Sequence, residues 1–109
     1  MGKPGSRLNL RIKFTDILGT TGQETSRVYF QPGSSVRMQY PAIVYARNRI
    51  QNKFADNQVY FQNDEWKVTV IDPDPDSEIV RAVSQLPGCQ HNRQYVADNL
   101  YHDVFTLHY

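Results

Sequence analysis

The sequence predicts an α+β domain, in which a mostly antiparallel sheet of roughly four to five strands carries one or two helices on one face. Short runs of β-branched and aromatic residues, such as Val28-Tyr29-Phe30, are bounded by turn residues and are typical of strands. Residues 79–86 carry apolar side chains at helical spacing. Residues 100–109 alternate between two faces, as a terminal strand does.

Length and composition are those of one ordinary folded domain. The chain has 109 residues, of which 39% are hydrophobic, and its twelve basic residues nearly balance its eleven acidic ones. This balance argues against disorder and against a surface built to attract polyanions. Seven tyrosines and five phenylalanines suit an assembly interface as well as a core.

The single cysteine, Cys89, argues against an intramolecular disulfide framework and predicts a reducing cytoplasmic environment. No stretch approaches the roughly 20 apolar residues of a membrane span, and the N-terminus lacks a secretory signal. We therefore expect a soluble protein with no membrane partner.

The N-terminal region divides into two parts. Residues 1–6 (MGKPGS) are polar and contain glycine and proline, so we expect a flexible N-terminal arm before a single domain at 7–109. Residues 7–19 have apolar side chains at both strand and helix spacing. Ser6 as an N-cap and Gly19 as a C′ residue favour the helix.

The rest of the chain predicts a series of strands and one further helix. The expected strands are 28–31, 40–45, 59–61, 65–71 and 100–109. Residues 59–61 and 65–71 would form a hairpin with a turn at Gln62-Asn63-Asp64, because Asn and Asp tolerate turn geometry. Within 65–71 the side chains of Trp66, Val68 and Val70 should share one face. Pro87-Gly88 ends the helix predicted at 79–86.

The segment 47–57 (RNRIQNKFADN) is polar and basic, and we expect an extended loop there. Its candidate contact residues are Arg47, Arg49, Lys53 and Phe54. A solvated loop and a contact loop for nucleic acid or for an acidic partner surface both fit this pattern.

Three aspartates separated by prolines, at residues 72–76, resemble the start of a calcium-binding loop. Such a loop needs Gly at its sixth position and Glu at its twelfth, where this chain has Ser77 and Val83. Asp74 as an N-cap, with Asp76 in the first helical turn, explains the same residues as a helix start. We therefore predict no metal site here.

No catalytic constellation is evident. If His102 and His108 share a face of one strand, they lie about 20 Å apart, too far to bind one ion. Cys89 and His91 are too sparse for a zinc site, and Cys89 lacks the flanking pattern of a nucleophile. The sequence therefore predicts no catalytic residue, no cofactor and no enzymatic activity.

Several segments nevertheless resemble a known family. They are VYFQP, YPAIVY, FADNQVY, WKVTVIDPDPDSEI, LPGC and YVADNLYHDVFTLHY, in this order and spacing. They resemble small tail-terminator or tail-completion proteins of the head–tail joining region of long-tailed bacteriophages. The resemblance runs from about residue 28 to residue 109 and is most specific in VTVIDPDPDSEI and ADNLYHDVF.

The resemblance implies a structural virion protein. It implies an α+β fold and a homohexameric ring at the neck, assembled in the host cytoplasm, that caps the tail tube. Its partners would be the tail tube protein and the connector proteins of the head, with transient contact to DNA in the lumen. The segment 47–57 and the N-terminal arm would then be candidate contacts with neighbouring subunits.

Three other functions stay open on the sequence alone. A head-completion or adaptor protein on the connector side belongs to the same class. A small nucleic-acid-binding module would use the basic residues of 47–57 and exposed aromatic side chains. A cation-dependent enzyme would use the aspartates of 72–76.

Overall fold

The computed structural model describes residues 6–33, 36–55 and 58–109, and it describes side chains at 7–33, 36–48 and 64–109. Two helices and five strands follow one another in this part of the chain. They are α1 (Ser6–Thr20), β1 (Val28–Phe30), β2 (Ala42–Ala55), β3 (Gln58–Asp72), α2 (Glu78–Ser84), β4 (Cys89–Ala97) and β5 (Leu100–His108). The predicted α+β class is confirmed.

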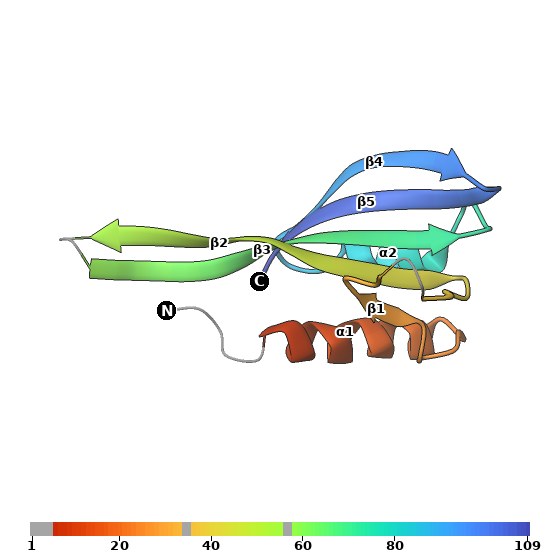
Figure 1. Cartoon of the computed structure of the whole chain (residues 1–109), viewed down its shortest axis with the longest axis horizontal. Helices are drawn as coiled ribbons and strands as arrows, with labels where there is room; N and C mark the ends of the chain where they lie inside the picture. The colour runs from red at the N-terminus through yellow and green to blue at the C-terminus, as the bar shows by residue number, and fades with distance from the viewer. Residues whose placement is uncertain (1–5, 34–35, 56–57) are drawn as a thin grey trace.

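One mixed sheet organises the molecule. Its strand order is β1-β2-β3-β5-β4, and every neighbouring pair is antiparallel except β1 with β2. Figure 1 shows α1 running beside the sheet near β1, and β2 and β3 continuing together well beyond the helices. The central strand β3 pairs with β2 from Gln58 to Ile71 but with β5 only from Glu65 onward.

The core lies between the helices and one face of the sheet. Trp66, Val68 and Val70 are all fully buried, which confirms that they share a face. They pack with the buried side of α1 and with Ile79 and Val83 of α2. Fully burying an aliphatic or aromatic side chain contributes about 1.5–3 kcal/mol, so this layer is the main source of stability.

Aromatic side chains fill the core beside α1. The ring of Tyr45 lies 5.2 Å from Phe14, 5.2 Å from Phe30 and 5.8 Å from Trp66, between ring centroids. Its hydroxyl donates a hydrogen bond of 3.1 Å to the carbonyl of Arg7 at the start of α1. The first helix is therefore held against the sheet by aromatic packing and, at its N-terminal end, by this partly buried hydrogen bond.

The helix predicted at 7–19 is confirmed, but its ends differ from the prediction. Ser6 belongs to α1, and residues 1–5 of the predicted N-terminal arm lie outside the described residues. Gly22, with φ +81°, occupies the C′ position instead of Gly19. The N–H of Gly22 donates to Gly19 and that of Gln23 to Leu18, which is the Schellman pattern.

The loop predicted at 47–57 is wrong up to residue 55, because β2 continues through it as far as Ala55. The turn predicted at Gln62-Asn63-Asp64 is also wrong, because these residues pair with Asn52, Gln51 and Ile50 in the ladder. The predicted strands 59–61 and 65–71 are thus one strand, β3. The backbone hydrogen bonds between β2 and β3 hold these residues in strands, although their polar side chains predicted a loop and a turn.

Strand β4 was not predicted from the sequence. Its burial is low at almost every position, so it lacks the alternation of a half-buried strand. Asp98 and Asn99, at φ +53° and +62°, form the tight turn to β5 that matches the twist of a hairpin. In the sequence, this Asp-Asn pair between two apolar residues is the feature that could have predicted the hairpin.

The backbone at Gly88 favours glycine, because its φ is +77° and a Cβ added there would lie 2.7 Å from the carbonyl oxygen of His108. We expect Gly88→Ala to lower the free energy of unfolding by about 1–3 kcal/mol in urea titrations. Gly33→Ala is the matched control, because its added Cβ meets nothing within 4 Å. An equal effect of both substitutions would contradict the assigned backbone strain.

Candidate functional site

The outer parts of β2 and β3 form a two-stranded extension, which we call the hairpin arm (residues 48–55 and 58–63). The molecule measures 51 × 28 × 24 Å, and Figure 1 shows that the hairpin arm accounts for much of the longest dimension. The ladder ends with Ala55 opposite Gln58. Residues 56 and 57, the last two of the predicted loop, lie outside the described residues.

Neither strand of the hairpin arm has a third strand beside it among the described residues. On one side, β1 pairs with β2 only at Ile43–Tyr45, and the side chain of Gln31 accepts one more hydrogen bond, from the Arg47 N–H. On the other side, the pairing of β5 with β3 ends at Glu65, followed by backbone bonds between Asp64 and Tyr109. Both outer edges of the hairpin arm therefore expose backbone N–H and C=O groups.

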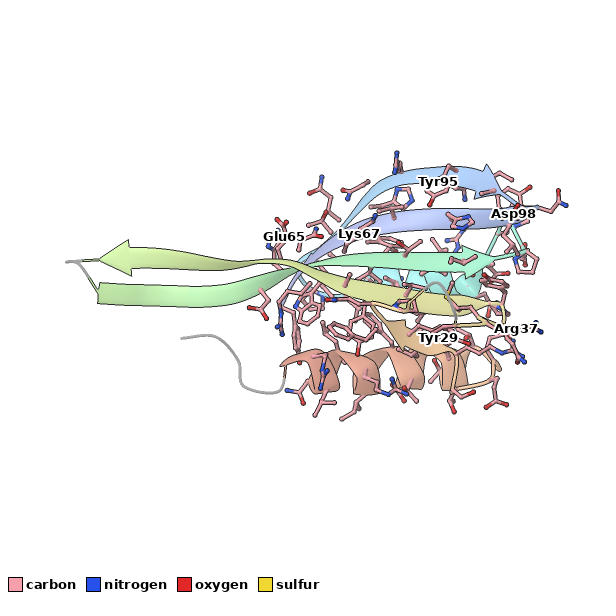
Figure 2. The ribbon with its side chains drawn as sticks, in the orientation of Figure 1. Tyr29, Arg37, Glu65, Lys67, Tyr95 and Asp98 are labelled. Carbon is pink, nitrogen blue, oxygen red and sulfur yellow. The ribbon has the colours of Figure 1, made fainter. Side chains whose placement is uncertain are left out.

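A break in register marks the point where the hairpin arm leaves the body. The pairing shifts between Arg47 and Arg49, which places Asn48 in a β-bulge. Its side-chain amide lies 3.5 Å from a carboxylate oxygen of Glu65. Figure 2 shows Glu65 at this crossing of the ribbons. A bulge bends a strand and increases its twist, so it sets the direction in which the hairpin arm projects.

The predicted contact residue Arg47 lies at the base of the hairpin arm and already has two partners. Its Nε atom lies 3.0 Å from a carboxylate oxygen of Asp64, whose side chain is only 8% exposed. Its guanidinium carbon lies 4.7 Å from the centroid of the Trp66 ring. Arg47 therefore connects β2 to β3 within one chain, which the sequence interpretation did not foresee.

The other predicted contact residues, Arg49, Lys53 and Phe54, lie on β2 within the hairpin arm. The ladder pairs their backbones with Glu65, Phe61 and Val59. Their side chains lie outside the described part of the chain. The structure thus brings these residues together on a projecting strand rather than in a loop.

The helix-cap prediction for Asp74 and Asp76 needs correction. The N-cap of α2 is Ser77, whose hydroxyl oxygen accepts a 3.2 Å bond from the N–H of Ile79. Asp74 accepts a 2.9 Å bond from the N–H of Asp76, and Asp72 accepts a 2.8 Å bond from that of Asp74. Asp74 thus stabilises a turn before the helix, and Asp76 supplies its backbone N–H to that turn.

A half-open cavity of about 400 Å³ lies beside this acidic turn. It is lined by residues 72–79 except Pro75, by Thr21 and Gln23 just after α1, and by Pro41. The carboxylates of Asp72 and Asp74 are directed at backbone N–H groups within the turn itself. Their first role is therefore to hold the connection between β3 and α2.

Two histidines fasten β4 to β5. His91 Nε2 lies 3.0 Å from a carboxylate oxygen of the buried Asp103, which also accepts a bond from the side chain of Gln94. The ring of His102 stacks on that of Tyr95, with centroids 4.7 Å apart and planes at 13°. Sequence spacing did not reveal these partners, because they depend on the register between two strands.

Cys89 is half-buried at the start of β4, and burial raises the pKa of its thiol to about 11. The thiolate, which is the nucleophilic form, is therefore a minor species at neutral pH. This disfavours Cys89 as a nucleophile.

No protein-family model matches the chain, and no curated protein matches it. Neither helix in the described part of the chain is long and apolar enough to cross a membrane.

The substitution Arg47→Met tests how much the Arg47 contacts contribute to stability. It keeps an apolar stem but removes the guanidinium partner of Asp64. We expect the free energy of unfolding to fall by about 1–3 kcal/mol, because a buried acceptor loses a charged donor. Lys67→Met on the exposed side of β3 is the control, with an expected change within about 0.5 kcal/mol. Equal losses in both variants would show that the Arg47 contacts contribute nothing.

Alkylation tests the assignment of Cys89. At pH 8 we expect iodoacetamide to modify the folded protein about tenfold more slowly than the protein unfolded in urea, because a raised pKa leaves less thiolate. The rate in the folded protein should climb as the pH approaches 11, where the thiol ionises. Equally fast modification of both states, followed by mass spectrometry, would contradict a shielded thiol.

Proposed function

We propose that this protein is a structural subunit that assembles with further copies of itself through its hairpin arm. The observation that carries the proposal is a pair of strands that extends beyond the body with both edges unpaired among the described residues. An isolated two-stranded ribbon is at best marginally stable in water. A ribbon of this kind gains stability when a partner strand or surface covers it.

The setting we propose is the head–tail joint of a long-tailed bacteriophage, because the sequence resembles proteins of that region. In this setting a ring of copies, six by that resemblance, caps the tail tube and docks to the connector of the filled head. A position on the connector side is the alternative within the same class. The proposed location is therefore the virion neck, with DNA passing through the ring.

The side-chain chemistry supports a structural role more than the two other classes. Arg47 is engaged with Asp64 and Trp66, which removes one of three basic residues proposed to contact nucleic acid. Tyr95 stacks on His102, and the guanidinium of Arg93 lies 5.1 Å from the Tyr95 centroid, so its ring already has two partners. Against an enzyme, the Cys89 thiol is protonated at neutral pH, and the carboxylates of Asp72 and Asp74 accept hydrogen bonds from backbone N–H groups.

Shortening the hairpin arm tests the proposal. Replacing residues 51–63 by Asn-Gly joins the register partners Ile50 and Asp64 with a two-residue turn that suits a hairpin. We expect the full chain to form a closed ring by native mass spectrometry and the shortened chain to be a monomer. Added to growing tail tubes, only the full chain should stop their extension.

The controls separate assembly from folding. The shortened chain must keep the circular dichroism spectrum and the cooperative unfolding of the body. The charge reversals Arg49→Glu and Lys53→Glu, with Arg47 unchanged, test the basic side of the hairpin arm without breaking the ion pair at its base. A full-length chain that stays monomeric at high concentration would refute self-assembly, and a ring with no effect on tail tubes would refute the phage setting.

A further inference from the structure

The outer edge of β4 is the longest exposed strand edge in the body. Strand β4 has nine residues and lies at one margin of the sheet, where β5 is its only partner strand among the described residues. Residues 90–96 are all exposed, and Val96 is 60% exposed. The strand contains neither lysine nor proline, two of the residues by which proteins keep an edge from pairing. A bulge at Asn92 is its main irregularity.

Side chains hold this edge strand firmly against β5. His91 binds Asp103, the side-chain amide of Asn92 donates a 2.7 Å hydrogen bond to Thr106, and Tyr95 stacks on His102. Figure 2 shows Tyr95 on β4, the strand farthest from α1. These contacts fix β4 in an extended form before any partner binds. A fixed edge loses little conformational entropy when another strand is added to it.

We propose that β4 of one copy pairs with the β2 strand of the hairpin arm of the next copy. The inference rests on the self-assembly described above and names the surface that receives the hairpin arm. Residues 48–55 of β2 and the nine residues of β4 have comparable length, so one contact would satisfy the exposed backbone groups of both. Each copy would offer one hairpin arm and one β4 edge.

The positions of the strands in the sheet favour β2 over β3 as the partner of β4. The free edge of β2 lies on the β1 side, whereas β4 forms the margin on the other side. When β4 of one copy pairs with β2 of the next, the first copy keeps a free β2 edge and the second keeps a free β4 edge. Further copies can therefore add through the same contact. Such a head-to-tail contact generates a ring when its rotation closes.

Two competing pairings fit less well. The free edge of β3 lies on the same side of the sheet as β4, so two copies could pair these edges reciprocally about a twofold axis, which would leave neither edge free for a further copy. Pairing the β2 strands of two hairpin arms would bring together two segments that each carry Arg49 and Lys53. Like charges on directly opposed strands are destabilising.

Cross-linking distinguishes these arrangements. In a Cys89→Ala background, one protein carries Gln90→Cys or Val96→Cys at either end of β4. The second protein carries Asn52→Cys on β2 or Gln62→Cys on β3, which are register partners at the same distance from the body. Equal amounts of the two proteins are mixed and treated with a short bismaleimide, and the products are identified by mass spectrometry.

We expect several-fold more product between β4 and Asn52→Cys than between β4 and Gln62→Cys. Predominant cross-links to Gln62→Cys in closed dimers would overturn the inference. A wild-type ring without either product would overturn the inference but leave the proposed function standing. A wild-type monomer would refute the proposed function and this inference together.

Hydrogen exchange provides a second measurement that needs no substitution in β4. In the wild-type assembly the amides of β4 and of residues 48–55 should exchange several-fold more slowly than in samples diluted to monomer. The chain shortened at 51–63 should lose the concentration dependence at β4. Equal exchange at β4 in all three samples would show that its edge stays free.

Discussion

The pairing of β3 with its two neighbours is the constraint on which the rest of the structure depends. β3 is 15 residues long and pairs with β2 from Gln58 to Ile71, whereas β5 pairs only with its second half. The half of β3 that lies between β2 and β5 contributes Trp66, Val68 and Val70 to the core. The other half leaves the body as the hairpin arm. One continuous ladder thus connects the hydrophobic core to the surface proposed to bind another copy.

The charged groups along this ladder act mainly within the chain. Arg47 and Asp64 join the two strands where the hairpin arm begins, and Arg47 also lies on Trp66 at the margin of the core. At the other end of β3, Asp72 and Asp74 satisfy backbone N–H groups in the turn before α2. Of the three basic residues between 47 and 53, Arg47 is therefore engaged within the chain, whereas Arg49 and Lys53 lie farther out on the hairpin arm.

Periodicity made much of the body predictable from the sequence. The helix α2, the strand β5 and the shared face of Trp66, Val68 and Val70 each have a buried side. The helix α1 also has a buried side, but its spacing fitted a strand equally well, and its expected cap residues favoured the helix. Burial on one side produces the helical or alternating pattern that sequence analysis detects. The α+β class followed from these elements.

The hairpin arm and β4 could not be predicted in the same way, because β4 is exposed on nearly all sides and residues 47–57 read as polar. Backbone pairing makes a strand of such a segment without leaving an apolar pattern. The sequence favoured Asp74 as the N-cap of α2 because Pro75 suits the first helical position. Serine caps helices about as well as aspartate, and the structure identifies Ser77. The partners of Arg47 depend on a register that the bulge at Asn48 sets.

The bulge at Asn48 and the ladder beyond it also limit how the hairpin arm can change during evolution. Successive side chains of a strand point to opposite faces, so adding one residue to each strand reverses the faces presented at the tip, while adding two restores them. Insertions and deletions in related chains should therefore come as matched pairs in β2 and β3. Reach would then vary in steps of about 6.6–6.8 Å, two residues of strand, while the body stays unchanged.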